Sequence, residues 1–450
     1  MKTATLTSSL LFIDTAPLAV RFEIMMASLM GFIAAGRYRD MLRLSHKVGR
    51  LVRVFPNPHF PPTTLPSGES PMQKFMSDSD VVDCVLSHVT NGTTDRGEDV
   101  WREPVENYRS PERLSRELAL FKTLPTPFCP SIALAKTGDY IARRAAGTPL
   151  IVVRGKDGKV RAFKNACRHR GAELASGAGC AGAFVCPYHG WSYGLDGALL
   201  GIPHEDGFPD IDKLSHGLAE VTAIETKGMV FVIQAEVGAD TAEALKMLEG
   251  VPDILRPDQI IFKESEGIIE ANWKLHLESF LEGYHIKTAH SKTFYPFGYD
   301  NLNVIEFCGP HARVTFPFRR IEKLADVAPA DRKVSDKLTY LNHLFPNVIL
   351  AELSHHRSLG ILEPLNERQT KITTYHMTKS TDNPDRDAVL ETANRDLEFV
   401  NGTGQLEDIA MVIGIQRSLP SGANEAFTFG HFEPAIVHFH KEMAARLAGL

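Results

Sequence analysis

The chain has 450 residues, a net charge of −6 at pH 7 and an isoelectric point near 6.3. This length allows two or three domains, and the acidic balance argues against a nucleic-acid-binding protein. Six cysteines in so long a chain do not make a disulfide framework, so we expect a reducing, cytoplasmic environment.

Residues 1–77 differ in composition from the remainder, and we expect them to be an N-terminal extension. Their apolar run over residues 24–36 falls short of the roughly 20 residues that a transmembrane helix needs, so no membrane span is expected. A basic stretch and a proline-rich run follow, and the latter indicates an extended, disordered linker. Three explanations stay open: an interfacial or targeting segment, a small helical appendage, or an over-extended start with initiation at Met72 or Met76, which we favour.

Two helices are predicted in a lead-in segment over residues 78–127. Apolar residues recur with helical spacing over residues 81–88 and 110–123. The second helix begins with a Ser-Pro-Glu triplet, which supplies an N-cap, a proline at the first helical position and an acid in the first turn. Helices therefore precede the first β region.

Short strands are predicted between residues 128 and 245. β-Branched and aromatic residues fill runs at 150–153, 160–163 and 229–233. An Asp-Gly pair joins the first two runs and is a hairpin signal. The pattern predicts a small antiparallel β domain.

Two loops of this β region pair a cysteine with a histidine. The first loop places Cys167 two positions before His169, and the second places Cys186 three positions before His189. Two thiolates and two imidazoles are the ligand set in which one iron of a [2Fe-2S] cluster is held by Cys and the other by His. A tetrahedral Cys2His2 zinc site uses the same donors and is the alternative, although zinc fingers rarely have a C-x-H first half.

Each loop extends into a longer signature, C-R-H-R-G in the first and C-P-Y-H-G-W in the second. With these motifs the chain resembles the Rieske ring-hydroxylating oxygenases, whose cluster-binding loops have these forms. High-potential respiratory Rieske proteins carry a further disulfide between the loops, but Ala172 and Tyr188 occupy those positions here. The resemblance implies a lower-potential Rieske [2Fe-2S] domain over residues 128–245. Cys180, which is out of the ligand register, is expected to be a small loop or core residue.

Residues 272–290 contain a second group of candidate site residues. Apolar residues recur along it at helical spacing, which predicts one helix with a single buried stripe. Glu282 precedes His285 by about one turn, so both side chains can project from the same face. His290 lies five positions further on, about 140° around an ideal helix. We expect a π-bulge or a break there if both imidazoles are to meet one ion.

This segment is similar to the N-W-K…Y-H-x4-H helix of the Rieske oxygenase catalytic domain. The resemblance implies that His285 and His290 bind a mononuclear non-haem Fe(II), completed by a distant carboxylate as a 2-His-1-carboxylate triad. Asp408, in a late segment similar to the family's E-D…Q-R-G-L…F-E-P pattern, takes the third position, and Glu407 and Asp396 are the alternatives. Four other histidines are expected to be core or helix-end residues: His276, His311, His343 and His355.

Glu282 is expected to act in catalysis as the link between the two metal centres. In the resembling enzymes a carboxylate three residues before the first histidine binds that ligand and, across a subunit boundary, the second Rieske histidine. The resemblance implies a path from His189 through Glu282 to His285 of a neighbouring subunit, and a carboxylate that orients a metal-bound imidazole is physically expected. Ser279 stands where many members have Asn, so the polarity of the pocket is expected to differ.

Residues 246–450 are predicted to form an α+β catalytic domain. Strand-like runs at 347–350 and 371–375 indicate an antiparallel sheet flanked by helices, which the resemblance implies is a helix-grip fold. Five phenylalanines are candidates for the lining of an apolar chamber, although a plain core is the simpler interpretation: Phe294, Phe297, Phe307, Phe316 and Phe318.

The resemblance implies the terminal oxygenase of a multicomponent system. Electrons from NAD(P)H would pass through a separate reductase or ferredoxin to the cluster, and the iron would use O2 to hydroxylate, dihydroxylate or demethylate an aromatic or other small organic substrate. A homotrimer is expected, with or without a β subunit, because a closed ring places each cluster beside a neighbouring iron. A Rieske-type electron carrier or redox protein without oxygenase activity and a zinc-dependent binding protein are the alternatives.

Overall fold

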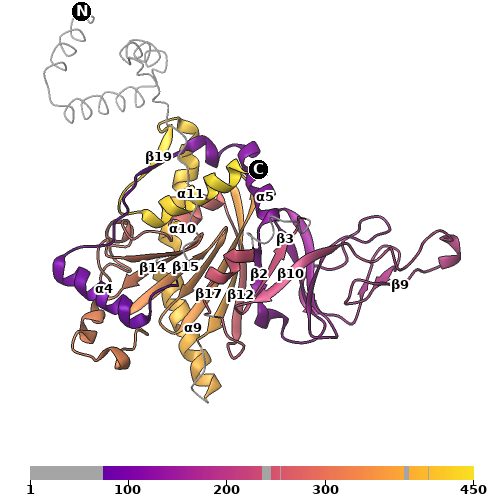
Figure 1. Cartoon of the computed structure of the whole chain (residues 1–450), viewed down its shortest axis with the longest axis horizontal. Helices are drawn as coiled ribbons and strands as arrows, with labels where there is room; N and C mark the ends of the chain where they lie inside the picture. Colours follow the sequence, from indigo (N-terminus) through magenta and orange to yellow (C-terminus); the bar gives the residue numbers. More distant parts are fainter. Residues whose placement is uncertain (1–73, 236–244, 254, 380–384, 404) are drawn as a thin grey trace, which may run out of the picture. The chain divides into compact units, whose positions relative to one another are not determined.

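The structure of the chain, a computed structural model (Figure 1), describes residues 74–235, 245–253, 255–379, 385–403 and 405–450. The described residues all belong to one compact unit of the chain. The expectations for the N-terminal extension concern residues that lie outside the described part as far as residue 73. Among the helices that are described, none has the length and apolar character that crossing a membrane requires.

Two helices open the described part of the chain. Helix α4 (Asp78–Asn91) begins at Ser77, whose side chain caps the first turn, and ends at Gly92 in the left-handed conformation. Helix α5 (Pro111–Thr123) begins at the side-chain cap of Ser110, with a proline at its first position. Both predicted helices are confirmed.

An antiparallel sheet of seven strands follows, with the order β2-β11-β10-β5-β4-β3-β6 in the described residues. Its strands are β2 (Thr126–Pro130), β3 (Asp139–Ala145), β4 (Thr148–Arg154), β5 (Val160–Lys164), β6 (Gly177–Cys180), β10 (Glu220–Thr226) and β11 (Met229–Ile233). The predicted hairpin between β4 and β5 is confirmed, and Gly158 takes the positive φ that its turn needs.

The Cys/His loops lie on this sheet and on a smaller one beside it. The smaller sheet has three strands, β7 (Phe184–Val185), β8 (Ser192–Tyr193) and β9 (Leu199–Gly201). The first loop lies between β5 and β6, and the second joins β7 to β8. The amide of Cys167 donates to Ala172 O and that of Cys186 to Trp191 O, each at 2.8 Å. These bonds close both loops.

A second antiparallel sheet of seven strands forms the core of the C-terminal region, with the order β12-β18-β17-β16-β15-β14-β13. Its strands are β12 (Ile261–Ile269), β13 (Val304–Cys308), β14 (His311–Pro317), β15 (Leu338–Leu344), β16 (Val348–Glu352), β17 (His356–Asn366) and β18 (Gln369–Thr378). The predicted strand runs at 347–350 and 371–375 fall in β16 and β18. A short pair, β1 (Trp101–Pro104) with β19 (Ala426–Phe429), ties the lead-in segment to the C-terminal segment.

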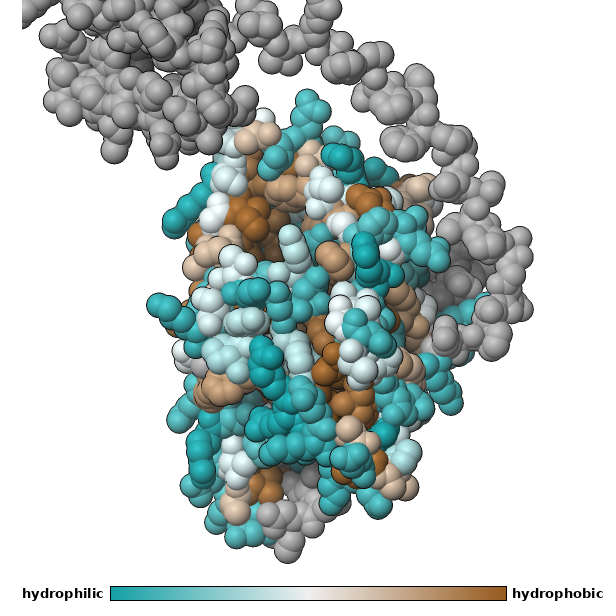
Figure 2. All heavy atoms as spheres, turned by 90° about the vertical axis from the view of Figure 1, so that its left-hand side faces the viewer, coloured by the Kyte–Doolittle hydropathy of each residue, from teal (hydrophilic) through white to brown (hydrophobic). Residues whose placement is uncertain are grey.

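Helices accompany the second sheet. They are α7 (Trp273–Glu278), α8 (Ile286–Ala289), α9 (Arg386–Thr403), α10 (Gln405–Ser418) and α11 (Pro434–Ala448). Short 3-10 helices join the elements: η1 (Val105–Tyr108), η2 (Ser131–Leu134), η3 (Glu205–Gly207), η4 (Met247–Gly250), η5 (Arg319–Leu324), η6 (Pro329–Asp331) and η7 (Leu419–Ser421). In Figure 1 the strands of the first sheet lie to the right of the second sheet, and α4 lies at the opposite side. Seen from the side of α4, the described surface is mainly hydrophilic, with hydrophobic side chains in narrow patches (Figure 2).

The prediction of a helix that breaks only between His285 and His290 is wrong, because the chain already leaves the helix between Glu278 and His285. Helix α7 ends at Glu278, because Ser279 Oγ donates to His276 O at 2.9 Å and the Glu282 carboxylate then accepts hydrogen bonds from following backbone amides. The single buried stripe is also wrong, since every residue of α7 is buried. The cause is that α7 contacts α10, β17 and, through a buried ion pair, α5.

The two large sheets share one hydrophobic core. Phe128 and Val152 of the first sheet belong to the same buried cluster as Leu359 and Tyr375 of the second. Because side chains alternate along a strand, the neighbouring residue Gly360 faces the other side of the second sheet. That side lines a cavity. The second sheet therefore separates the packing face from the face on which the candidate site lies.

Candidate functional site

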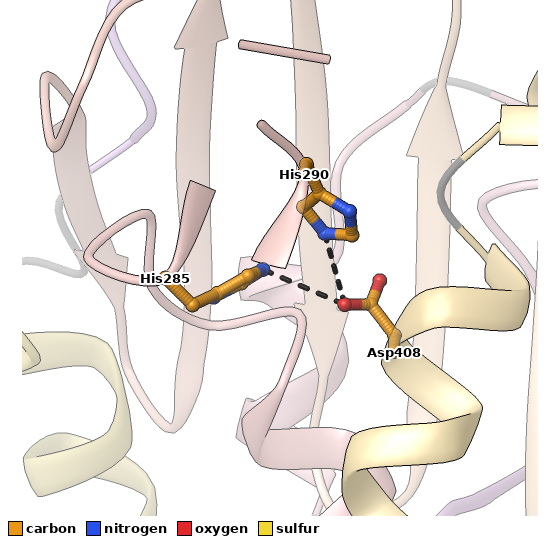
Figure 3. A group of neighbouring side chains, drawn as sticks. All are labelled: His285, His290 and Asp408. Carbon is orange, nitrogen blue, oxygen red and sulfur yellow. Dashed lines mark ion pairs between the residues drawn. The ribbon is translucent and has the colours of Figure 1, made fainter. Parts of the chain in front are cut away.

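Three side chains that are distant in sequence meet beside the second sheet (Figure 3). Asp408 Oδ1 lies 2.9 Å from His290 Nε2 and 3.6 Å from His285 Nε2. One possible ligand atom from each residue lies within 4.8 Å of those of the other two. Asp408 comes from α10, whereas the histidines flank α8. Two imidazoles and one carboxylate are the donor set of a non-haem Fe(II) site, so the residues fit such an ion.

The two histidines stand at the ends of the short helix α8. His285 O accepts from Ala289 N at 2.8 Å, and Ile286 O accepts from His290 N at 3.0 Å. His290 then leaves the helical conformation, with φ −108° and ψ 33°. Both imidazoles therefore reach one point although five residues separate them. The helix thus ends at His290, as one of the expected alternatives, whereas the break before His285 was not predicted, and the described segment contains no π-bulge.

Glycine is required in the turn before the first histidine. A Cβ atom at Gly283 would lie 2.2 Å from Asn303 Oδ1. Asn303 is itself fixed, because its Nδ2 donates to Thr315 O on β14 at 3.0 Å. A larger residue at position 283 would push the turn that carries His285 away from the sheet.

Each imidazole of the triad contacts a carboxylate through its Nδ1 atom. Glu282 contacts His285 Nδ1, as its spacing led us to expect. Glu407 Oε2 lies 2.7 Å from His290 Nδ1 and accepts from Thr293 Oγ1 at 2.7 Å. Glu407 was an alternative third ligand in the sequence, but the structure places it on the far nitrogen of His290. Both contacts engage Nδ1 and leave Nε2 for a metal ion.

These carboxylates make both imidazoles more basic. Burial lowers the pKa of His285, but Glu282 and the charge of Asp408 outweigh it, so that the pKa is raised. Burial likewise lowers the pKa of His290, and the bonds to Asp408 and Glu407 raise it overall. The hydrogen bonds from His290 and Thr293 lower the pKa of Glu407. Glu407 therefore stays ionised behind its histidine.

The two histidines of the Cys/His loops lie side by side, and the two cysteines contact each other. His169 Nδ1 and His189 Nδ1 lie 3.1 Å apart, and both cysteines are buried while His189 is exposed. Burial raises the pKa of Cys186, but hydrogen bonds from the amides of Tyr188 and His189 and from Cys167 lower it overall. Inner thiols and outer imidazoles fit a [2Fe-2S] cluster with Cys on one iron and His on the other.

Two residues that support these donors were missed in the sequence. Tyr193 OH lies 3.2 Å from Cys167 Sγ and accepts from Arg168 N at 3.0 Å, so its own hydrogen is left for the sulfur. Trp191 stacks on His169, with ring centroids 5.0 Å apart and planes 8° from parallel. Both residues lie close to the second motif, but no spacing rule connects Tyr193 with a cysteine of the other loop. Hydrogen bonds to sulfur tune the potential of a cluster.

A cavity of about 540 Å³ opens beside the triad. His285, His290 and Asp408 line it, together with the side chains of β15, β16, β17 and β18 that face away from the first sheet. Its volume lies in the range of about 300–1,000 Å³ that is usual for small-molecule sites. Of the five candidate phenylalanines, Phe307 packs elsewhere, in a cluster on α11. The remaining four line the cavity: Phe294, Phe297, Phe316 and Phe318.

The other polar candidates fall into two groups. His311 and His343 are core residues, as expected, and burial lowers their pKa values to about 4 and about 3. His276 is a buried residue in the last turn of α7, as expected, but it also lines the cavity, as does His355, which the sequence did not predict. Burial lowers the pKa of His276 to about 4, and its Nδ1 has no hydrogen-bond partner among the described residues.

Two further candidates lie away from the metal donors. Asp396 Oδ2 accepts from His355 N at 2.7 Å and lies 2.8 Å from His356 Nδ1, so it is not part of the triad. Cys180 is exposed at the end of β6, and its sulfur lies 3.8 Å from Thr137 O. It is therefore a surface residue of a strand and not a core residue.

Two family models match the chain. The Rieske [2Fe-2S] domain matches residues 125–219, and the ring hydroxylating alpha subunit (catalytic domain) matches residues 236–449. The first match covers both Cys/His loops, and the second covers the triad and the cavity. An iron-sulfur domain in this position speaks against the zinc alternative.

Curated relatives match over part of their length. The glycine betaine monooxygenase oxygenase subunit of Chromohalobacter salexigens is 39% identical over 158 residues, 34% of this chain and 35% of the relative. The carnitine monooxygenase oxygenase subunit of Acinetobacter baumannii is 33% identical over 199 residues, 42% of this chain and 53% of the relative. The alignments thus span about one third to one half of these relatives.

Solved structures match over most of the chain. A quaternary ammonium Rieske monooxygenase in complex with L-carnitine has a TM-score of 0.63 at 20% identity, over 83% of this chain and 99% of that chain. Naphthalene 1,2-dioxygenase from Rhodococcus sp. has a TM-score of 0.63 at 17% identity, over 82% of this chain and 98% of that chain. These matches confirm the predicted α+β fold class, a β Rieske domain followed by an α+β catalytic domain.

Proposed function

The chain belongs to the Rieske-type ring-hydroxylating oxygenase alpha subunits, and we propose that it is the terminal oxygenase component of an electron-transfer system. Its cofactors are a Rieske [2Fe-2S] cluster and a mononuclear iron. When bound, these groups supply electrons and activate O2 for the oxidation of an organic substrate. The observation that carries the proposal is that His285, His290 and Asp408 line a cavity in the chain that also carries the cluster loops.

The residues that hold the cofactors are part of the proposal. We assign Cys167 and Cys186 to one iron of the cluster and His169 and His189 to the other, which agrees with the inner position of the thiols. His285, His290 and Asp408 are assigned to the mononuclear iron, because both Nε2 atoms face the same carboxylate oxygen. Glu282 and Glu407 orient the imidazoles from their Nδ1 atoms.

Glu282 is proposed to link the iron of one subunit to the cluster of another. Its carboxylate contacts His285 Nδ1 and accepts from the backbone amide of His285 at 3.2 Å, so its position is fixed by the turn. His189 is exposed and stacks on Tyr188, which is also exposed, so this edge of the cluster loops is available to a neighbouring subunit. A closed homotrimer would bring these surfaces together, with or without a β subunit.

The proposed partners follow from the lack of a nicotinamide or flavin motif in the sequence. A separate reductase or ferredoxin would deliver electrons from NAD(P)H to the cluster. A reducing cytoplasm is the proposed compartment, because the cluster cysteines must stay unpaired with other cysteines to bind iron.

The substrate is proposed to be a small organic molecule with a large apolar part. Relatives of the chain are named for glycine betaine, carnitine and naphthalene, so neither the substrate nor the choice between monooxygenation, dioxygenation and demethylation follows from them. The aromatic lining of the cavity supports an apolar body, which the four phenylalanines contact on several sides.

Iron content and O2 uptake test the proposal. After anaerobic loading we expect about three irons per chain, two in the cluster and one at the triad, and O2 uptake with a generic ferredoxin and reductase in the presence of a substrate. Asp408→Asn should bind about two irons and keep the EPR signal of the reduced cluster, whereas the exposed-site control Asp387→Asn should bind about three. Two irons in the unaltered protein, with no O2 uptake under any reductant, would support the electron-carrier alternative instead.

A further inference from the structure

The part of the cavity wall that β17 and β18 form carries one polar pair. Ser358 on β17 and His376 on β18 both line the cavity and are directly opposite each other in the sheet register. Ser358 Oγ lies 2.8 Å from His376 Nδ1. His376 is almost completely buried, and Ser358 is half-buried. The rest of β17 and β18 that lines the cavity is apolar or small except for Thr374.

This polar pair lies far from the metal donors. Leu362 and Ile372, which form the corresponding pair four residues along each strand, pack in the cluster that contains Leu277 of α7. Helix α7 lies at the triad end, because the charge of Asp408 acts on His276. A β-strand rises about 3.3 Å per residue, so Ile372 and His376 are separated by about 13 Å of strand. The cavity therefore has an iron end and a polar end.

One hydrogen-bond donor of the Ser358–His376 pair has no acceptor within the pair. Burial, followed by the nearby charges of His356 and Lys263, lowers the pKa of His376 to about 4, so the imidazole is neutral at physiological pH. The pair then has two donors, one hydroxyl and one ring N–H, and their mutual hydrogen bond uses one of them in either tautomer. The remaining donor suits an acceptor on a ligand.

The carboxylates of the cavity wall already have partners. Asp396 is bound by the His355 amide and by His356. Asp336 lies 3.0 Å from Lys337 Nζ and 3.7 Å from an Arg320 nitrogen. Apart from Asp408, these are the carboxylates among the described lining residues. The cavity wall therefore offers a ligand a neutral hydrogen-bond donor rather than an unpaired carboxylate.

We propose that Ser358 and His376 form a substrate subsite that hydrogen-bonds an acceptor oxygen on an elongated, mainly apolar molecule whose opposite end lies at the iron. The inference rests on the proposed oxygenase function, since it assigns the triad end to the carbon that is oxidised. It names the substrate class as arenes or aliphatic chains that carry a carbonyl, hydroxyl or ether oxygen at the end remote from the reacting carbon.

Binding of three probes with the same biphenyl body tests the subsite. The probes are para-acetylbiphenyl, which has an acceptor oxygen, para-isopropylbiphenyl, which has the same shape without it, and biphenyl-para-trimethylammonium, which is cationic. Titration calorimetry on the iron-loaded protein without O2 measures each dissociation constant. We expect the acetyl probe to bind about tenfold more tightly than the isopropyl probe, the effect of one buried hydrogen bond.

Substitutions assign this preference to the pair. In the double variant Ser358→Ala with His376→Phe no donor of the pair remains, so the acetyl and isopropyl probes should bind within about twofold of each other. Ile372→Val is the matched control, because it trims the same face of β18 without removing a polar group, and it should keep the tenfold preference. If the double variant fails to fold, Ser358→Ala with His376→Leu replaces it, because Leu is smaller than Phe and also has no donor.

Several outcomes would overturn the subsite. Equal affinities in the unaltered protein, no binding of any probe, tighter binding of the trimethylammonium probe, or a preference that survives both substitutions would each do so. The measurement needs neither O2 nor a reductant. Loss of O2 uptake with every substrate would therefore contradict the proposed oxygenase function without bearing on the probe affinities.

Discussion

Each imidazole of the triad is held from behind by its own carboxylate, and the two carboxylates come from different parts of the chain. Glu282 belongs to the turn that carries His285, whereas Glu407 comes from α10, which also supplies Asp408. Helix α10 thus contributes one group that faces the ion site and one that fixes the opposite side of a histidine. Adjacent residues of a helix project about 100° apart. Asp408 can therefore face the ion site while Glu407 contacts His290 from the opposite side of the imidazole.

Glu407→Gln should weaken iron binding by about 10–100-fold, the usual effect of losing a carboxylate behind a metal-bound imidazole. The amide oxygen of Gln can still accept from His290 Nδ1, so the imidazole keeps its orientation but loses the negative charge that makes it basic. Titration of the apoprotein with ferrous iron against a competing chelator measures the affinity.

The exposed residue Glu391, on the neighbouring helix α9, supplies the control. Its carboxylate pairs with Arg395 at the surface, and Glu391→Gln should leave the iron affinity unchanged. An unchanged affinity in Glu407→Gln as well would show that the contact with His290 contributes nothing to the site.

The identity of these residues could be predicted only in part. The spacing of three residues placed Glu282 beside His285, because that relation is local and holds for one turn of chain. The family resemblance selected Asp408 over Glu407, but the spacing of residues could not, because neighbouring carboxylates at the start of a helix look alike until the rotation of that helix against the sheet is known. Ser358 and His376 carried no signal, since their meeting depends on the register of two strands.

Helix α7 is short but is fixed on every side. Its buried Lys274 Nζ lies 2.8 and 2.9 Å from the two carboxylate oxygens of Glu117 on α5, and neither side chain is more than 1% exposed. Trp273 Nε1 and Arg113 Nε donate to the same carboxylate, each at 2.9 Å. A buried ion pair of this kind adds little net stability as a whole, but it is costly to break.

Glu117→Gln should lower the free energy of unfolding by about 3–5 kcal/mol, because it leaves the Lys274 ammonium buried without its counter-charge. Urea denaturation followed by tryptophan fluorescence measures the loss. Since α7 leads into the turn that carries the histidines, the affinity for iron should fall in the same variant.

Two further variants separate the charge from the shape of this contact. The control Glu112→Gln lies on the exposed part of α5 and should change stability by less than about 0.5 kcal/mol. The double variant Glu117→Leu with Lys274→Met should recover part of the loss, since it removes both charges together but leaves Trp273 Nε1 and Arg113 Nε without their acceptor. A double variant as unstable as Glu117→Gln would contradict this account.

Strands and hairpins were predicted better than the helix that bears the ligands. The Asp-Gly turn and the flanking β-branched runs are local signals, and β4 and β5 follow them. The segment over residues 272–290 has a helical pattern throughout, yet it breaks, because the side chains of Ser279 and Glu282 take hydrogen bonds that a helix would need. Whether side chains take backbone hydrogen bonds away from a helix depends on their burial, and the spacing of apolar residues does not show which side chains are buried.

The two large sheets are joined through a shared core and one buried carboxylate. Glu363 of β17 accepts from the amides of Gly147 at 2.9 Å and Ala146 at 3.3 Å, in the turn between β3 and β4. Burial raises the pKa of Glu363, although these amides and the nearby arginines lower it in part. The first sheet is thus attached to the catalytic sheet by a carboxyl group that resists ionisation.

Stability should therefore fall with rising pH through this group. A carboxyl group whose pKa is higher in the folded than in the unfolded protein binds more protons in the folded state, so the free energy of unfolding decreases as the pH rises from the unfolded value through the folded value. Glu363→Gln removes this titration. Its melting temperature relative to that of the unaltered protein should rise as the pH increases above the usual pKa of a glutamate and level off once Glu363 is ionised in the folded protein, as measured by calorimetry.

Glu249→Gln, on the exposed side of η4, is the control for this comparison and should run parallel to the unaltered protein over the same range. A difference between Glu363→Gln and the unaltered protein that stays constant with pH would mean that Glu363 does not change its protonation in the folded chain.

The sequence by itself determined the two cofactors, the residue types that hold them and most of their positions, because each Cys/His loop and the histidine pair are continuous motifs whose donors lie within a few residues. Tertiary structure decided the rest. The carboxylate that faces the ion site, the partner behind His290, the wall of the cavity and the pairing of Ser358 with His376 all join segments that are far apart in the chain. Strand register and the rotation of α10 against the sheet bring these groups together, and neither can be read from local spacing.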